Sequence, residues 1–365
     1  MLDRMQRLRR GAVTAVGMAA AVVVLASCGA TGPRNHQNTI HPAGPAAQKI
    51  LNLFTPFFWV AVVIGAAVVG MTIFIAIRFR EKPGEERNPV QTHGNVVLEV
   101  SWTIIPFLIL AVMAVPTVAT IFNLAKIPHG RDVVHVEVDA RQWFWQYVYT
   151  DKDTGFYTAN EMHIPINHPI ELTLKSNNVI HSFWVPELAG KKDVVPGHTN
   201  NLEIEASHPG VFTGQCAEYC GLSHANMRLR VVAQTQSDYD AWVAQQKTPL
   251  APSKVVEFTK DISAKWGCLS CHSVTNLTSN IGVTIGPNLT HVADREAFAG
   301  DIYQMTQSNL AKWVYNAPAR KPAGPLKGWM PDFSAEGMTM PQAQQIAHFL
   351  LCETATRPTA HPECR

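Results

Sequence analysis

Two long apolar runs near the start of the chain limit its architecture more than any other feature. Residues 53–79 contain FFWVAVVIGAAVVGMTIFIAI, and residues 96–122 contain WTIIPFLILAVMAVPTVATIF. A helix of about 20 apolar residues crosses the ~30 Å hydrocarbon core of a membrane, and each run is longer than that. The sequence therefore predicts two transmembrane helices, 53–79 and 96–122, joined by a loop at residues 80–95.

The N-terminus has the pattern of an export signal. The arginine-rich stretch MLDRMQRLRR precedes an apolar run, residues 11–25, that is too short to span a membrane comfortably. The run ends in Leu25-Ala26-Ser27-Cys28, which resembles the bacterial lipoprotein box, where cleavage precedes a cysteine that is then lipidated. We expect a signal peptide at 1–27 and an external segment at 28–52; a chance cysteine after an ordinary signal peptide is the alternative.

The charge of the loop sets the expected topology. Arg78, Arg80, Lys82 and Arg87 lie in or beside residues 80–95, and basic loops stay in the cytoplasm. Everything after Phe122 is then outside the membrane, on the periplasmic or extracellular side of a bacterial cell. Disulfides persist in that compartment. The net charge of +2 gives no reason to expect nucleic acid as a partner.

The remaining chain divides into two soluble regions. Apolar and polar residues alternate at 134–139, 170–175 and 227–231, and this alternation is typical of half-buried strands. Several short strands separated by turns predict a small β-sandwich or barrel over residues 126–246. The segment KTPLAPS, residues 247–253, suits a stiff linker. A second domain, 254–365, follows, with helical spacing at 309–317 and 342–351.

The most unusual motif is GQCAEYCGLSHANMR, residues 214–228, which contains the pattern C-x-E-x-C-x-x-x-H-x-x-M. Thiolate, imidazole and thioether groups favour copper or zinc over magnesium or calcium, and zinc rarely takes methionine. The motif therefore favours copper. A disulfide between Cys216 and Cys220 is the alternative, but it would close a loop too short to gain much entropy, and it does not explain His224 or Met227.

This motif resembles the dinuclear copper (CuA) loop of cytochrome c oxidase subunit II. That family takes a further histidine from H-S-F-x-x-P, and residues 181–186 read HSFWVP. The carboxylate of the glutamate in the loop is implied to face a magnesium ion at the boundary with subunit I. The resemblance implies these copper ligands: bridging Cys216 and Cys220, one imidazole each from His181 and His224, a weak Met227, and the backbone carbonyl of Glu218.

Two other stretches resemble the same family. Residues 141–147, RQWFWQY, resemble H-Q-W-Y-W-S-Y, which implies that Trp143 receives electrons beside the copper. Arg141 and Phe144 replace the family's histidine and tyrosine, so the hydrogen bonds of those side chains are not carried over. Residues 93–106 resemble the start of the second helix, where the glutamate matching Glu99 opens a proton channel into subunit I. An interfacial anchor is the alternative role for Glu99.

Residues 268–272, CLSCH, form the attachment motif of c-type haem. The thiols of Cys268 and Cys271 are expected to add to the haem vinyl groups, and the imidazole of His272 to reach the iron; a chance match or a redox role of the two thiols is the alternative. A cytochrome c also needs a downstream methionine. Met330 lies in GWMPDF, which resembles the axial loop of small bacterial cytochromes c, and Met340 is the alternative.

Other residues of this region have expected roles in packing, in orienting the histidine or in a disulfide. Met305 and Met338 are interpreted as packing residues. Residues 286–289, GPNL, resemble the loop in which a proline carbonyl, here that of Pro287, orients the haem histidine. Cys352 and Cys364 are left either as a disulfide that fixes the C-terminal tail or as two free thiols.

The order of these parts resembles subunit II of haem-c-fused, caa-type oxidases. It implies a multidomain membrane protein: a two-helix transmembrane hairpin, a cupredoxin-like β-sandwich and an all-α class I cytochrome c domain. Electrons would pass from cytochrome c or a cytochrome bc complex through haem c and the copper pair to haem a of subunit I. Oxygen is reduced to water there, with proton pumping. Subunit I, subunit III and membrane lipid are the implied partners, and the short linker favours the haem domain as direct donor to copper.

Three rival classes differ from this interpretation in specific features. Nitrous oxide reductase carries a similar copper loop but needs a large catalytic domain that this chain lacks. A free-standing membrane electron carrier needs only apolarity in its anchor, whereas the second helix carries Glu99, Trp102 and Pro106. Quinol oxidase subunit II keeps the fold without the copper ligands.

Overall fold

The computed structural model describes residues 37–80, 84, 91, 93–127, 130, 132–150, 155–274, 285–324, 329–356 and 361–364. By their backbone contacts, residues Gln37–Arg365 form one unit. The predicted signal peptide, the lipidation site at Cys28, and Lys82 and Arg87 of the predicted cytoplasmic loop lie outside the described residues.

Two helices of the described chain are long and apolar enough to cross a membrane, namely α2 (Pro45–Arg78) and α3 (Val96–Leu124). Helix α2 begins with a proline in its first turn, where the missing N–H costs nothing, and so it starts before the predicted position 53. Residues 45–52, assigned to the external segment, are therefore helical. Asn95 caps α3 by accepting hydrogen bonds from the N–H groups of Val97 and Leu98.

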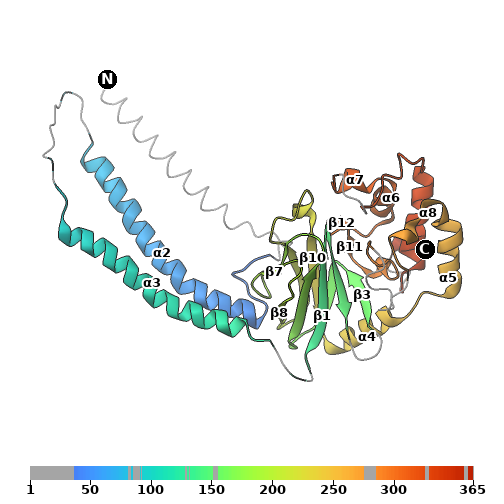
Figure 1. The fold of residues 1–365 in the computed structure, drawn as a ribbon, viewed down its shortest axis with the longest axis horizontal. Helices are drawn as coiled ribbons and strands as arrows, with labels where there is room; N and C mark the ends of the chain where they lie inside the picture. Colours follow the sequence, from blue (N-terminus) through green and yellow to red (C-terminus); the bar gives the residue numbers. More distant parts are fainter. Residues whose placement is uncertain are drawn as a thin grey trace. The chain divides into compact units, whose positions relative to one another are not determined.

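The middle of the chain forms a β-sandwich, which the described residues build from two five-stranded sheets (Figure 1). The strand order is β3-β2-β1-β5-β8 in one sheet and β4-β10-β9-β6-β7 in the other. The pairs β1/β5 and β4/β10 are parallel, and the other pairs are antiparallel. The strand bounds are β1 Val134–Arg141, β2 Phe144–Tyr149, β3 Phe156–Ala159, β4 Glu161–Pro165, β5 Ile170–Ser176, β6 His181–Trp184, β7 Lys192–Val194, β8 Asn200–Ile204, β9 Gly210–Cys216 and β10 Arg228–Gln234.

The predicted alternation is confirmed in the packing of these strands. In β5, Ile170, Leu172 and Leu174 are buried and the residues between them are partly exposed. Strand β10 repeats this pattern from Leu229 onward. Each buried aliphatic side chain contributes about 1.5–3 kcal/mol relative to exposure, so this alternation fixes which face of each strand lies inside the sandwich.

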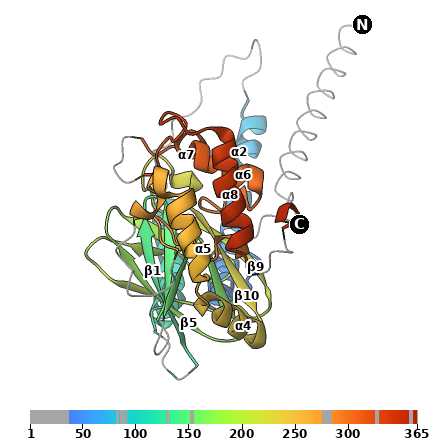
Figure 2. The ribbon, with the colours of Figure 1, turned by 90° about the vertical axis from the view of Figure 1, so that its right-hand side faces the viewer.

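The C-terminal region follows helix α4 (Gln236–Lys247) and the short segment 248–251. Pro252, placed in the predicted linker, begins helix α5. The helical spacing predicted at 309–317 and 342–351 corresponds to α6 and α8, and α8 continues into a π-helical turn over Phe349–Glu353. The helices are α5 Pro252–Glu257, α6 Gln307–Tyr315, α7 Ala317–Arg320 and α8 Met340–His348, and α5, α6 and α8 lie together in both views (Figure 1, Figure 2).

One feature of this region differs from an all-α domain. Strands β11 (Ala297–Phe298) and β12 (Tyr303–Gln304) pair in antiparallel fashion. The turn between them contains Ala299, Gly300 and Asp301, all with positive φ, and this left-handed backbone reverses the chain tightly. Cys352 and Cys364 form a disulfide, with their Cα atoms 5.4 Å apart, which resolves the alternative left open above.

Candidate functional site

The fold brings the residues of the cysteine-rich motif together at one end of the second sheet. Cys216 is the last residue of β9, and it pairs with Phe183 of β6. His181 is the first residue of β6. The chain then turns back through Cys220 and a 3-10 turn at His224–Asn226 to enter β10. Strand pairing therefore places His181 beside a loop that lies more than thirty residues later.

The donor atoms of this cluster converge on one small volume. The Sγ atoms of Cys216 and Cys220 lie 3.7 Å apart. The Nδ1 atom of His181 is 3.8 Å from Cys216 Sγ, and that of His224 is 3.6 Å from Cys220 Sγ. The thioether of Met227 is 3.8 Å from Cys220 Sγ. The carbonyl oxygen of Glu218 lies 3.2 Å from Cys216 Sγ.

These separations fit metal ions held between the donors. Metal–sulfur and metal–nitrogen bonds of about 2.3 and 2.0 Å, at a tetrahedral angle, place sulfur and nitrogen about 3.5 Å apart. The two sulfur–nitrogen pairs are close to this value. His181, Cys216 and Cys220 are also buried, whereas His224 is partly exposed. The donor set is soft, as copper prefers.

The pKa values of the two thiols depend on each other. The hydrogen bond between them lowers the pKa of Cys216 and raises that of Cys220, because a thiol can stabilise its neighbour's thiolate only while it keeps its own proton. His181 and the backbone also lower the pKa of Cys216. The first proton of the pair is therefore lost more easily than the second, and a bound metal would favour the thiolate form of both.

Residues around the cluster orient its ligands. The Nε2 atom of His181 donates to Oδ1 of Asn178 at 3.1 Å, and this contact holds the ring with Nδ1 facing Cys216. Metal-binding histidines are commonly held in this way. Gln142 and Trp143 both donate to the carbonyl oxygen of Cys220. The partnership of Asn178 with His181 could not be predicted from the sequence, because it depends on how the turn that contains Asn178 folds.

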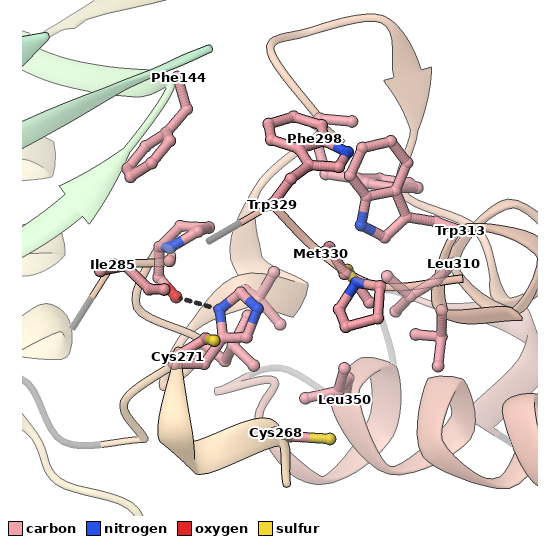
Figure 3. Close-up of a pocket in the computed structure, with 18 of the residues that line it drawn as sticks. Phe144, Cys268, Cys271, Ile285, Phe298, Leu310, Trp313, Trp329, Met330 and Leu350 are labelled. Carbon is pink, nitrogen blue, oxygen red and sulfur yellow. Dashed lines mark hydrogen bonds between the residues drawn. The ribbon is translucent and has the colours of Figure 1, made fainter. Parts of the chain in front are cut away.

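A second candidate site is an apolar cavity in the C-terminal region. Cys268, Cys271, His272 and Met330 all line it. Figure 3 shows the sulfur atoms of Cys268 and Cys271 and the side chain of Met330 around the same space. Met340 begins α8 and does not line the cavity. Other lining residues are Phe258, Trp266, Leu310, Trp313, Phe333, Ile346 and Leu350.

The histidine of this cavity, His272, is oriented by a hydrogen bond to a loop that lies later in the sequence. His272 Nδ1 donates to the carbonyl oxygen of Pro287 at 2.8 Å (dashed line in Figure 3). Burial lowers the pKa of His272, so its ring is neutral and Nε2 can accept a metal. Gly286 allows this approach, since a Cβ there would lie 2.7 Å from His272 Cε1.

The cavity also has polar atoms that fit a haem. Haem is an apolar ring with two carboxylates, and Arg295 lines the cavity while remaining buried. Its Nη2 donates to the carbonyl of Asn288, but its Nε has no hydrogen-bond partner among the described residues. A free buried guanidinium N–H suits a carboxylate of such a ligand. Sequence patterns gave no signal for Arg295, which lies outside the haem-attachment motif.

The two candidate sites approach each other through aromatic side chains. Trp143 packs edge to face against Trp329, with ring centroids 5.6 Å apart, and Trp329 precedes Met330. Trp143 is only 1% exposed. Lys321 also reaches Trp143, through a hydrogen bond to its backbone oxygen. Lys321 and Trp329 were not identified from the sequence, because Lys321 belongs to no recognisable motif and the contact of Trp329 with Trp143 depends on how the two domains meet.

Glu99 lies apart from both cavities, in the first turn of α3. Its Oε1 accepts a hydrogen bond from the backbone N–H of Asn95 at 3.2 Å. Asn95 thus satisfies backbone N–H groups of the first helical turn, and Glu99 in return satisfies the backbone N–H of Asn95. This contact gives Glu99 a structural role, and its suggested proton-channel role stays a prediction.

The paired apolar helices, the sandwich and the buried sulfur–imidazole cluster define a membrane-anchored protein of the cupredoxin-like class. The family model "Cytochrome C oxidase subunit II, transmembrane domain" matches residues 34–120, and the family model "Cytochrome C oxidase subunit II, periplasmic domain" matches residues 155–234. The chain is 34% identical over 316 residues to cytochrome c oxidase subunit 2 of Alkalihalophilus pseudofirmus, covering 84% of this chain and 90% of the relative. The chain belongs to the cytochrome c oxidase subunit 2 family.

Other relatives and a solved structure show the range of this similarity. Cytochrome c oxidase subunit 2 of Bacillus sp. strain PS3 is 34% identical over 84% of this chain and 88% of its own length. Quinol oxidase subunit 2 of Bacillus cereus is 32% identical over 60% of this chain and 78% of its own length. The crystal structure of the periplasmic domain of subunit II from Bradyrhizobium japonicum is 29% identical, covers 33% of this chain and 97% of that one, and gives a TM-score of 0.31.

Proposed function

We propose that this chain is the subunit at which electrons enter a haem-copper terminal oxidase, and that a CuA centre receives them. The supporting observation is the convergence of the buried His181, Cys216 and Cys220, together with the partly buried His224, on one small volume at metal-binding separations. A quinol oxidase subunit would not need this donor set. Met227 and the Glu218 carbonyl complete the ligands, and the copper pair would accept and release one electron at a time.

The C-terminal region is proposed as a cytochrome c domain. Cys268 and Cys271 would attach the haem, and His272 and Met330 would be its axial ligands. The hydrogen bond from His272 to Pro287 supports this assignment, since it fixes the tautomer that can bind iron. The haem would supply a second one-electron carrier beside the copper domain.

The contacts between the two domains support direct donation. Trp143 is covered by residues of the C-terminal region, including Trp329. A separate donor, either cytochrome c or a cytochrome bc complex, would then deliver its electron to the C-terminal domain, and Trp143 would carry it to the copper loop. The copper centre in turn would reduce haem a of subunit I, where oxygen is reduced with proton pumping.

The membrane helices would bring this chain into contact with lipid and with its partner subunits. Helices α2 and α3 expose their apolar side chains, and these would contact lipid, subunit I and subunit III. The Glu218 carboxylate is proposed to face a magnesium ion at the subunit I boundary, and Glu99 to open a proton channel there. Cys28 is proposed as a lipid anchor on the outer side of the bacterial cell membrane.

The test is metal analysis with optical and electron paramagnetic resonance spectra of the purified full chain in detergent. We expect about two coppers with a mixed-valence signal and one c-type haem. Cys216→Ser should remove the copper signal and leave the haem band, whereas Cys268→Ser should do the reverse. Haem without the copper signal would contradict the oxidase assignment. Co-purification of a large haem-containing subunit tests the partnership with subunit I.

A further inference from the structure

Lys321 is a buried lysine that the C-terminal region inserts against the copper domain. It follows α7 and is only 1% exposed. Its Nζ donates to the backbone oxygen of Trp143 at 2.7 Å and to that of Ala299 at 2.8 Å. No carboxylate of the described chain forms an ion pair with it. A buried lysine that contacts carbonyl groups alone is unusual, because lysine is almost never fully buried without a charged partner.

The surrounding backbone is shaped to admit this side chain. Gly300 has a φ of +82°, and a Cβ there would lie 2.7 Å from Lys321 Nζ and 2.4 Å from the carbonyl oxygen of Asn226. The backbone N–H of Arg228 donates to the Gly300 oxygen at 3.2 Å. A glycine is therefore needed where the β11–β12 turn, the lysine and the copper loop meet.

Polar contacts on either side hold the two domains together around Lys321. Arg230 of β10 forms an ion pair with Asp301 at 2.6 Å and another with Glu296. The hydroxyl of Ser223, in the copper loop, donates to the backbone oxygen of Pro322. These contacts seat the C-terminal region on the loop that carries the proposed ligands, with the ammonium group enclosed at the centre.

Burying an ammonium ion costs several kcal/mol unless nearby groups stabilise its charge. Burial lowers the pKa of Lys321 to about 7, while Cys220 acts in the opposite direction. The ammonium group is linked to Cys220 through Trp143, whose backbone oxygen accepts from Lys321 and whose indole donates to the Cys220 carbonyl.

We propose that Lys321 is a positioning residue that, when protonated, brings a positive charge to the copper site and makes the site easier to reduce. The inference rests on the proposed function. Reduction adds one electron to the copper pair and breaks no bond, so the total charge of the site falls by one. A neighbouring cation stabilises the more negative state. Because the C-terminal domain carries Lys321, its contact with the copper domain would therefore favour electron transfer to copper.

The test is a potentiometric titration of the copper signal in the purified full chain at pH 6, where the ammonium group is charged. Lys321→Met removes the charge and both hydrogen bonds, and Lys321→Gln removes the charge but keeps an N–H donor. We expect both variants to lower the equilibrium constant for reduction by about tenfold, which corresponds to a fall of about 59 mV for one electron. Lys312→Met, which removes an exposed lysine of α6, should leave the potential unchanged.

Hydrogen exchange of residues 141–147 provides a readout that does not depend on the metals. Lys321→Met should increase exchange there more than Lys321→Gln. Unchanged potentials in both Lys321 variants, with the copper signal intact, would overturn the inference. Loss of the copper signal in both would also overturn it, because Lys321 would then be required to build the site rather than to set its potential. Absence of the mixed-valence signal from the wild-type chain would instead contradict the proposed function.

Discussion

The indole Nε1 of Trp143 donates a hydrogen bond to the backbone oxygen of Cys220 at 2.9 Å. The same oxygen accepts from Gln142 Nε2 at 2.8 Å. Trp143 and Gln142 lie in the turn between β1 and β2, so the first sheet holds the cysteine loop of the second. The Trp143 ring thereby reaches the backbone of a proposed bridging ligand, while its other neighbour, Trp329, lies beside the proposed haem cavity.

Trp143→Phe should slow electron transfer to copper without removing the copper. Phenylalanine lacks the indole N–H, but Gln142 still holds the Cys220 oxygen, so the loop should keep its shape. We expect the rate of copper reduction to fall by roughly tenfold or more, equivalent to about 1.4 kcal/mol in the barrier. The measurement is rapid mixing with a reduced donor, followed at the copper absorption.

Gln142→Ala is the matched control for this substitution. It removes the other hydrogen bond to the same oxygen and leaves the indole in place. Similar rates in the alanine variant and the wild-type chain, with a slow Trp143→Phe variant, would support a role for the ring itself. Equal slowing in both variants would show that only the loop position matters.

Asn178→Ala should weaken copper binding through His181. The amide oxygen of Asn178 accepts from His181 Nε2, and loss of such a partner typically costs 10–100-fold in metal affinity, a range of roughly 1.4–2.8 kcal/mol. Competition with a copper chelator measures this change. Asn200→Ala removes an exposed hydrogen bond to the Asp193 oxygen and should leave the affinity unchanged. Wild-type affinity in Asn178→Ala would contradict the positioning role.

The sequence was sufficient to predict the elements whose patterns are local. The apolar runs gave both membrane helices, although α2 starts at Pro45 because a proline is well tolerated in a first helical turn. The alternation of apolar and polar residues predicted strands β5 and β10, whose side chains lie alternately inside and outside the sandwich. The metal-ligand types of the cysteine-rich loop were also readable, since their spacing is short.

Contacts between distant segments could not be predicted in this way. Asn178, Lys321 and Trp329 acquire their roles only when a turn, a loop and a second domain meet. Lys321 in particular lies in a stretch whose composition indicates a solvated loop, yet it is buried. The positive-φ turn at 299–301 likewise contacts the copper domain through Arg228 and Arg230, and a local pattern does not contain these contacts.

Gly286→Ala should displace the histidine of the proposed haem site. The new Cβ would lie 2.7 Å from His272 Cε1 and 3.1 Å from the Cys271 oxygen, so the backbone or the imidazole must move. Such overpacking typically costs about 1–3 kcal/mol of unfolding free energy. We also expect the hydrogen bond from His272 to Pro287 to be lost, which should change the haem absorption and potential.

The control for the glycine substitution is Gly65→Ala in α2, where nothing lies within 4 Å of the added Cβ. Denaturant unfolding and the haem spectrum of both variants should be compared in the same detergent. An unperturbed spectrum in Gly286→Ala would mean that this glycine does not set the position of the histidine.

Asp294→Asn should reduce the sensitivity of the C-terminal region to acid. Asp294 Oδ1 accepts from the backbone N–H and the hydroxyl of Thr356, at 3.0 and 3.1 Å, and His291 lies beside the other oxygen. Burial acts to raise the pKa of Asp294, but His291 and Thr356 outweigh it and hold the pKa below its ordinary value. The folded chain therefore binds this proton less readily than the unfolded chain does.

The sign of the pH dependence follows from that difference. The stabilisation by Asp294 is complete above its ordinary pKa of about 3.9 and is lost as the pH falls through the lower folded pKa, because the unfolded state binds more protons there. Asparagine cannot titrate. The unfolding free energy of the variant should therefore fall less between pH 5 and pH 2 than that of the wild-type chain, and the difference is the contribution of Asp294. At pH 7 the variant should be less stable by about 1.5–3 kcal/mol, the usual contribution of hydrogen bonds to a charged group. Glu336→Gln, which removes an exposed acid, should follow the wild-type curve, and a parallel curve for Asp294→Asn would show that another group controls acid unfolding.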